Sequence, residues 1–174
     1  MQYISRYKSP LGGILLAADE TGLTGLWFEG QKYFARSLDR EHEEKELLVF
    51  KQAKRWLDIY FSGKEPGFEL PLHFIGTDFQ IRVWKMLCDI PYGQTTTYGA
   101  LAERLAAERG IPRMSARAIG GAVGHNGISI IVPCHRVVGS GGKLTGYAGG
   151  IHKKTELLRL EGALIQGISS DERG

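Results

Sequence analysis

The chain has 174 residues, of which 43% are hydrophobic and 24% are charged, and its formal net charge at pH 7 is +3. This composition is typical of an ordinary soluble globular protein, and no apolar stretch is long enough to cross a membrane. The two cysteines exclude a disulfide framework and a cysteine-rich zinc site, and the first residues lack the layout of a signal peptide. We therefore expect a reducing, cytoplasmic location.

The amino-terminal lobe, residues 1–74, is predicted to be β-rich with one helix. Turn sequences separate three short apolar or alternating runs that are expected to be strands, at residues 3–9, 12–18 and 23–29. Residues 44–63 have helical spacing, with an apolar face made of Leu48, Ala53, Trp56, Leu57 and Tyr60. A glycine and a proline follow this helix, so we expect a linker to a second lobe.

The carboxy-terminal lobe, residues 75–165, is predicted to be mostly helical, and residues 166–174 are expected to form a flexible tail. Thr77 is followed three residues later by Gln80, which is the pattern of a capping box at the start of a helix. The apolar stripe of this helix is expected to contain Phe79, Val83, Trp84 and Leu87. Cys88 comes four residues after Trp84, so we expect it to be an inert core thiol. The predicted fold class is mixed α/β, of the α+β kind.

Two shorter helices are expected at about residues 97–109 and 115–124, joined by a short connection as in a helix-turn-helix. Helical hairpins that bind nothing share this pattern. Ser115 can cap the second helix, whose interior holds Gly120 and Gly121, and each glycine costs about 1 kcal/mol relative to alanine. Either close packing within the protein or contact with a nucleic-acid groove would offset this cost. In the second case Arg117 would project from the helix face.

Residues 111–155 contain no Asp or Glu. The basic residues of this segment are Arg113, Arg117, Arg136, Lys143, Lys153 and Lys154, together with His125, His135 and His152. A field of one sign attracts a polyanion such as nucleic acid, although a chance imbalance of surface charge gives the same count.

Cys134 lies between Pro133 and His135 in the sequence IVPCHRVVG, within a stretch expected to be buried and extended. A cysteine attacks as the thiolate, and its usual pKa of about 8.5 is lowered by positive charge or by a nearby base. Neighbouring residues in a strand point to opposite faces, so His135 can serve Cys134 through a water, or directly if the chain bends at Pro133. Glu161 is the best local candidate to orient the histidine. The alternative is a buried, unreactive cysteine.

The sequence IVPCHRVVG resembles the active-site signature of the O6-alkylguanine-DNA alkyltransferases, which repair DNA by direct reversal of damage. The resemblance extends, in the family's order, to FQIRVWKMLCDIPYGQTTTYGALA, ARAIGGAVGHN, GYAGG and LLRLEG, and covers most of residues 79–162. The amino-terminal lobe matches only in size and in its order of strands and helix. That lobe has no cysteine, so the zinc site of some family members cannot form in it.

The resemblance implies a role for each residue that matches a catalytic position of the family. Cys134 would take the alkyl group by displacement and keep it as a thioether, so each molecule would act once. His135 would relay the proton through a water, and Glu161 would hold that histidine. Tyr98 would protonate the departing guanine at a ring nitrogen and help to rotate the nucleotide.

The resemblance also implies how DNA and the alkyl group would be bound. The helix at 115–124 would enter the minor groove, and Arg117 would fill the gap left by the extruded base. The other residues expected to contact DNA are Ser115, Ala118, Gly121, Arg136 and Thr97. The residues expected to form the alkyl pocket are Tyr147, Ala148, Gly149, Val132 and Asn126, with Asn126 also bracing the turn before the active-site stretch. Gly149 stands where some members have a bulky ring, which implies a roomier pocket, and Ala148 lacks the hydroxyl or charged group that some members carry there.

The implied partner is double-stranded DNA carrying O6-alkylguanine, bound by a monomer without a cofactor or a metal. Whether O4-alkylthymine is also a substrate is left open. Three alternatives remain. A lesion sensor of the alkyltransferase-like kind would bind without repair, although such proteins lack the reactive cysteine. A cysteine hydrolase would turn over repeatedly and ignore DNA. A helix-turn-helix regulator would have no use for an activated thiol.

Overall fold

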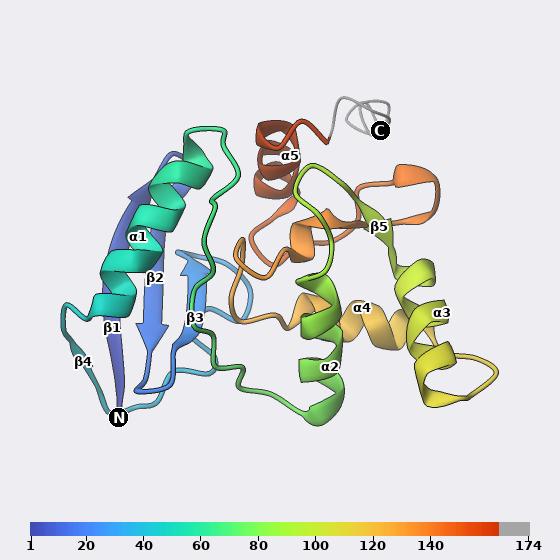
Figure 1. The fold of residues 1–174 in the computed structure, drawn as a ribbon, viewed down its shortest axis with the longest axis horizontal. Coiled ribbons are helices and arrows are strands. Elements are labelled where there is room, and N and C mark those ends of the chain that lie inside the picture. The colour runs from blue at the N-terminus through green and yellow to red at the C-terminus, as the bar shows by residue number, and fades with distance from the viewer. Residues whose placement is uncertain (164–174) are drawn as a thin grey trace. The chain divides into compact units, whose positions relative to one another are not determined.

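The computed structural model describes residues 1–163, which divide into two compact units. The first unit consists of Met1–Gly76 together with Gly127–Ser129, and the second of Thr77–Asn126 and the chain from Ile130 onward (Figure 1). The predicted α+β class is confirmed, because the first unit contains a sheet with one helix and the second is mainly helical. The predicted tail, 166–174, lies outside the described residues.

The first unit is built on a four-stranded sheet with the strand order β3-β2-β1-β4. β1 (Gln2–Ser9), β2 (Gly12–Ala18) and β3 (Leu23–Phe28) form an antiparallel meander, which confirms the three predicted strands. β4 (His42–Glu44) pairs with β1 in parallel and was not predicted. Its three residues are charged or polar and exposed, so they lack the apolar alternation by which a strand is recognised.

α1 (Leu48–Phe61) contacts β1 and β2 through a buried face made of Phe50, Ala53, Leu57 and Tyr60. The helix was predicted, but the assignment of Leu48 to its apolar face was wrong, because that side chain is 71% exposed. Leu48 precedes Leu57 by nine residues. At about 100° per residue, this separation places the two side chains on opposite sides of the helix. Phe50 fills the inner position instead.

Two segments distant in the sequence extend the first unit beside β3. The backbone N–H of Leu23 donates to the carbonyl of Pro71 at 2.8 Å, and that of His73 donates to the carbonyl of Leu23 at 2.7 Å. The segment 127–129 pairs with Leu26, which donates to Gly127 at 2.9 Å and accepts from Ser129 at 3.1 Å. The chain is therefore anchored in the first unit a few residues before Cys134.

The second unit begins with α2 (Asp78–Leu87), and both hydrogen bonds of the predicted Thr77–Gln80 capping box are present. The indole of Trp84 donates to the carbonyl of Ala122 at 2.8 Å. The prediction that Cys88 is a core thiol was wrong, because it is exposed at the C-cap of α2. The buried stripe is centred on Val83 and Leu87, and Cys88 falls about 120° from that centre.

The expected helix pair is present as α3 (Tyr98–Arg109) and α4 (Ala116–Gly124), and the two helices contact each other. Thr97 caps α3 and Ser115 caps α4, each hydroxyl accepting from a backbone N–H in the first turn. The short strands β5 (Thr96–Thr97) and β6 (Val137–Val138) pair in parallel, and α5 (Ile151–Leu160) follows. Two 3-10 turns, η1 (Cys134–Arg136) and η2 (Ser140–Gly142), interrupt the chain on either side of β6. No helix within residues 1–163 is long and apolar enough to span a bilayer.

Candidate active site

Cys134 lies in a turn rather than in an extended strand. The buried stretch was expected to be extended through Cys134, but only Val137–Val138 is a strand, and Cys134–Arg136 form the 3-10 turn η1. The backbone N–H of Arg136 closes this turn onto the carbonyl of Pro133 at 3.0 Å. The chain therefore bends at Pro133. Such a bend is what His135 would need in order to accept the Cys134 proton directly. Ile130, four residues earlier, is buried with a φ of 68°, a strained conformation for a β-branched residue.

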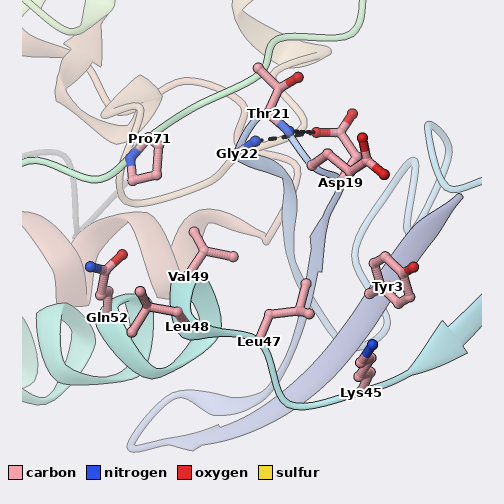
Figure 2. Close-up of a pocket in the computed structure, with 11 residues that line it drawn as sticks. Tyr3, Asp19, Thr21, Gly22, Lys45, Leu47, Leu48, Val49, Gln52 and Pro71 are labelled. Carbon is pink, nitrogen blue, oxygen red and sulfur yellow. Dashed lines mark hydrogen bonds between the residues drawn. The ribbon is translucent and has the colours of Figure 1, made fainter.

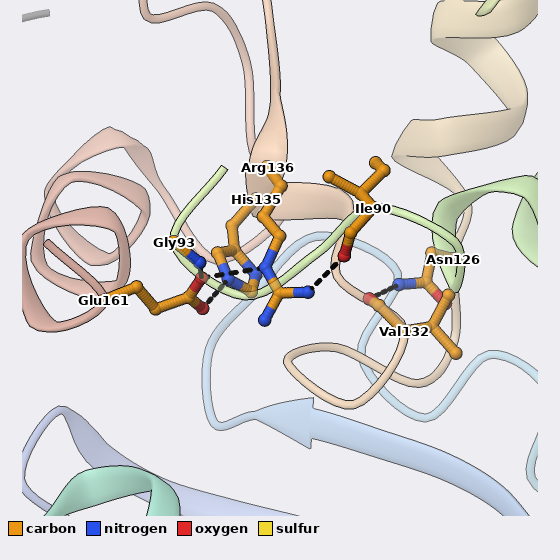
Figure 3. A network of polar contacts seen from close by, with 7 residues as sticks. All are labelled: Ile90, Gly93, Asn126, Val132, His135, Arg136 and Glu161. Atoms are coloured by element: carbon orange, nitrogen blue, oxygen red, sulfur yellow. Dashed lines mark hydrogen bonds and ion pairs between the residues drawn. The ribbon is translucent and has the colours of Figure 1, made fainter. Parts of the chain in front are cut away.

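The residues after Cys134 belong to a buried polar network centred on Glu161 (Figure 3). Glu161 Oε2 lies 2.6 Å from His135 Nε2, and its Oε1 accepts from Arg136 Nε at 2.8 Å. The backbone N–H of Gly93 donates to Oε1 at 3.1 Å, and Arg136 also donates to the carbonyl of Ile90 at 2.7 Å. The carboxylate thus holds the histidine, the arginine and the loop at Gly93 in fixed positions.

The electrostatics of this network favour a carboxylate, a guanidinium and a neutral imidazole. Burial acts to raise the pKa of Glu161, but the hydrogen bonds from His135 and Arg136 and the charge of Arg136 outweigh it and lower the pKa to about 2. Burial lowers the pKa of His135 in spite of the opposing effect of Glu161. A neutral His135 that donates from Nε2 to the carboxylate has Nδ1 as its basic nitrogen. The arrangement therefore supplies an oriented base in the residue that follows Cys134.

The Cys134 thiol is buried, and burial raises its pKa. A hydrogen bond from the Asn126 side chain and the charge of Lys154 act in the opposite direction. Asn126 also donates through Nδ2 to the carbonyl of Val132 at 2.9 Å, so it fixes the backbone just before the bend. The resting thiol is therefore protonated, and it depends on a base and on nearby positive charge to become a nucleophile.

Lys154 is part of this site and was not among the predicted site residues. It is fully buried, and its Nζ donates to three backbone carbonyls, those of Val137, Thr145 and Gly146, at 2.6, 3.3 and 3.4 Å. Burial lowers its pKa to about 8. Helical spacing could have placed it on the inner face of α5, because it precedes the buried Leu157 and Leu158 by three and four residues. In the sequence it was counted only as part of a basic segment.

Tyr98 and the loop before α5 carry further predicted residues. Tyr98 is half-buried, its pKa is raised by burial, and its hydroxyl accepts from Thr145 Oγ1 at 3.1 Å. Tyr147, Ala148 and Gly149 are half-buried in the same loop, whereas Val132 is fully buried.

The predicted DNA-contacting residues divide into an exposed group and a buried one. Four of them are exposed on α4 and its cap: Ser115, Arg117, Ala118 and Gly121. Thr97 is half-buried, and its hydroxyl caps α3. Arg136, in contrast, is buried and ion-paired with Glu161, so its assignment as a DNA contact is corrected to a structural one. Because Arg136 and Lys154 both point inward, the acid-free segment presents less positive charge at the surface than its composition suggests.

A separate hollow of about 440 Å³ lies in the first unit, near the start of α1 (Figure 2). Asp19, Lys45, Leu48 and Pro71 are among its lining residues, and none of the predicted site residues lines it. Within residues 1–163, no group of three or more His, Cys, Asp or Glu side chains is arranged to hold a metal ion.

Comparison with known proteins identifies the family. Residues 78–163 match the model of the 6-O-methylguanine DNA methyltransferase DNA binding domain, and residues 2–74 match that of the ribonuclease-like domain of the same proteins. A methylated-DNA–protein-cysteine methyltransferase of Methanosarcina barkeri is 49% identical over 160 residues, which cover 91% of this chain and 96% of the relative. The relative from Mycobacterium bovis is 46% identical over 153 residues, which cover 88% of each protein.

Solved structures agree with this result. The crystal structure of the Mycobacterium tuberculosis O6-methylguanine methyltransferase superposes with a TM-score of 0.78 at 44% identity, covering 94% of each chain. A structure of the M. tuberculosis protein in complex with DNA also has a TM-score of 0.78 at 44% identity, and it covers 92% of this chain and 93% of that one. The chain belongs to the 6-O-methylguanine DNA methyltransferase family.

Proposed function

We propose that this protein repairs O6-alkylguanine in double-stranded DNA by moving the alkyl group to the sulfur of Cys134. The observation that carries the proposal is the turn after Pro133, in which a buried cysteine is followed directly by a histidine held by a buried carboxylate. This arrangement suits an activated nucleophile, and relatives that are 46–49% identical are named methylated-DNA–protein-cysteine methyltransferases.

In the proposed reaction the Cys134 thiol gives its proton, through a water, to Nδ1 of His135. The sulfur then attacks the alkyl carbon, the carbon–sulfur bond forms and the bond from that carbon to guanine O6 breaks. Tyr98 donates its hydroxyl proton to a ring nitrogen of the departing guanine. Glu161 and Arg136 act through His135 by fixing its position and its tautomer. The thioether has no route back to the thiol, so each molecule reacts once.

The exposed face of α4 is the proposed DNA contact. A base must leave the stack before its O6 substituent can meet a buried sulfur, and insertion of a side chain from the minor groove is a known way to extrude it. Arg117 is the proposed inserted side chain. A Cβ added to Gly121 would meet nothing within 4 Å, so close packing inside the described chain does not account for this glycine. Contact of this face with an external surface such as DNA would account for the glycine.

The proposed pocket for the alkyl group is walled by Val132, Tyr147, Ala148 and Gly149, with Asn126 fixing the backbone of its floor. The absence of a side chain at Gly149 supports tolerance of adducts larger than methyl. We further propose that the protein acts as a monomer in the cytoplasm, where it reaches DNA in the nucleoid.

Intact mass spectrometry after mixing the protein with a duplex that contains one O6-methylguanine tests this function. We expect a gain of one methyl group per molecule, mapped to Cys134. The Cys134→Ala variant is expected to bind the duplex but gain no mass. Cys88→Ala is the matched control, because it removes the exposed thiol and should leave the reaction intact.

Two of the alternative functions, the sensor and the hydrolase, predict different results in the same experiment. Lesion-selective binding without a mass change would identify a sensor instead of a repair protein. Unchanged mass without binding would overturn both readings and favour a hydrolase, which would then release product repeatedly from an ester or an amide.

A further inference from the structure

The hydroxyl of Tyr98 is itself held by a neighbouring side chain. Thr145 Oγ1 donates a hydrogen bond to it at 3.1 Å, across 47 residues of sequence. This bond uses a lone pair of the phenol oxygen and leaves the phenol's own proton available to another acceptor. The hydrogen bond also acts to lower the pKa of Tyr98, against the effect of burial.

Two further contacts hold Thr145 in place. Its carbonyl accepts from the buried ammonium of Lys154 at 3.3 Å. Its methyl group Cγ2 packs close to Gly139. A Cβ added to that glycine would be only 3.0 Å from the methyl group. Threonine is stiff about χ1, so a fixed methyl group also fixes the direction of the hydroxyl. Backbone and side chain together therefore aim Oγ1 at Tyr98.

We infer that Thr145 is a positioning residue for alkyl transfer, which orients the Tyr98 hydroxyl and stabilises the phenolate as its proton passes to the departing guanine. Thr145 keeps its own proton throughout, and the Tyr98 proton ends on the guanine ring nitrogen. A hydrogen bond to a group that becomes charged strengthens as the charge develops, so its contribution is greatest in the transition state. This inference rests on the proposed role of Tyr98 as the proton donor.

The test uses single-turnover rate constants with O6-benzylguanine as the free base, which separates transfer from DNA binding. Thr145→Val keeps the shape of the side chain without its hydroxyl, and we expect a rate about tenfold lower, the loss typical of one such hydrogen bond. Thr145→Ser keeps the hydroxyl and should stay within about threefold of the wild type. Thr155→Val, a half-buried threonine on α5, is the matched control and should retain the wild-type rate.

A second variant perturbs the same contact while leaving the hydroxyl in the protein. Gly139→Ala places a methyl group against Thr145 Cγ2, so the threonine side chain must shift and the rate should fall as in Thr145→Val. A wild-type rate for Gly139→Ala in a protein that unfolds at the wild-type temperature would count against fixed positioning of Thr145.

The Tyr98→Phe background separates this inference from the role of Tyr98 itself. Tyr98→Phe alone is expected to slow transfer, and adding Thr145→Val should then have no further effect. If Thr145→Val slows the reaction equally in both backgrounds, Thr145 does not act through Tyr98 and the inference is wrong. If Tyr98→Phe reacts at the wild-type rate, the proposed role of Tyr98 fails and the inference fails with it, although transfer to Cys134 still stands.

Discussion

The residues around Cys134 place charge in the protein interior, where each charge needs a partner. Arg136 offsets Glu161, whereas Lys154 has no carboxylate partner in the described contacts and is held by three carbonyl oxygens. Burying a charge with only dipoles around it is costly, and the lowered pKa of Lys154, about 8, reflects that cost. The positive charge of Lys154, kept near Cys134 in spite of this cost, favours the thiolate form of the cysteine.

Replacing Lys154 by Met should therefore disfavour ionisation of the Cys134 thiol and also weaken the hydrogen bonds that hold the loop before α5. The three carbonyls lose their donor, and Cys134 loses a nearby positive charge, so its pKa rises further. We expect the transfer rate at pH 7.5 to fall by at least about tenfold, with the rise of rate with pH displaced to higher pH. Single-turnover rates with free O6-benzylguanine across pH 6–10 measure both effects.

Lys153→Met is the matched control for this prediction, because it removes the neighbouring lysine of the same helix. It should keep both the rate and the pH profile of the wild type. A Lys154→Met protein with an unchanged pH profile would show that the lysine supports the loop alone and does not affect the ionisation of Cys134.

At the scale of helices and strands, the features that local chemistry determines were predictable and those that depend on distant contacts were not. The capping box at Thr77 and the cap at Ser115 follow from residues within one turn, and both are present. The strand β4 is a strand only because β1 lies beside it. The 3-10 turn at Cys134 was visible in the sequence only as a proline that permits a bend. Likewise, the inward direction of Arg136 depends on Glu161, which lies 25 residues away.

Helix α4 permits a test that separates folding from DNA binding. Gly121 is exposed and has open space around its Cα, so Gly121→Ala should raise the free energy of unfolding by about 0.5–1 kcal/mol, the usual gain in a helix interior. Gly121→Leu should fold equally well but hold the helix away from the groove, weakening duplex binding about tenfold or more. Denaturant unfolding and fluorescence-anisotropy titration at fixed salt measure the two quantities.

The result with a free base completes the test of α4. Gly121→Leu should react with O6-benzylguanine at the wild-type rate, because the variant leaves the Cys134 site untouched. Wild-type affinity for duplex DNA in Gly121→Leu would contradict the proposal that this face enters the groove.

At the scale of the whole molecule, the buried network links stability to pH through Glu161 and His135. The pKa of Glu161 is about 2 in the folded protein against an ordinary value of 4.5. As pH falls, the unfolded chain therefore takes up this proton first, and the contribution of Glu161 is complete above pH 4.5 and lost as pH approaches 2. His135 also makes the folded protein less stable as pH falls below the ordinary pKa of histidine. The folded protein buries this residue in the neutral form, so the unfolded chain takes up the proton first. The network thus makes the protein sensitive to acid.

Glu161→Gln isolates the contribution of the carboxylate. At pH 7 the variant leaves the Arg136 guanidinium buried without its counter-ion, so we expect a loss of about 3–5 kcal/mol in the free energy of unfolding. A pKa difference of about 2.5 corresponds to about 3 kcal/mol, of which about 2 kcal/mol is already lost at pH 3. The gap between wild type and variant should therefore shrink by about 2 kcal/mol between pH 6 and pH 3, as measured by urea unfolding. Parallel stability curves over that range would show that the contacts with His135 and Arg136 do not hold the pKa of Glu161 below its ordinary value.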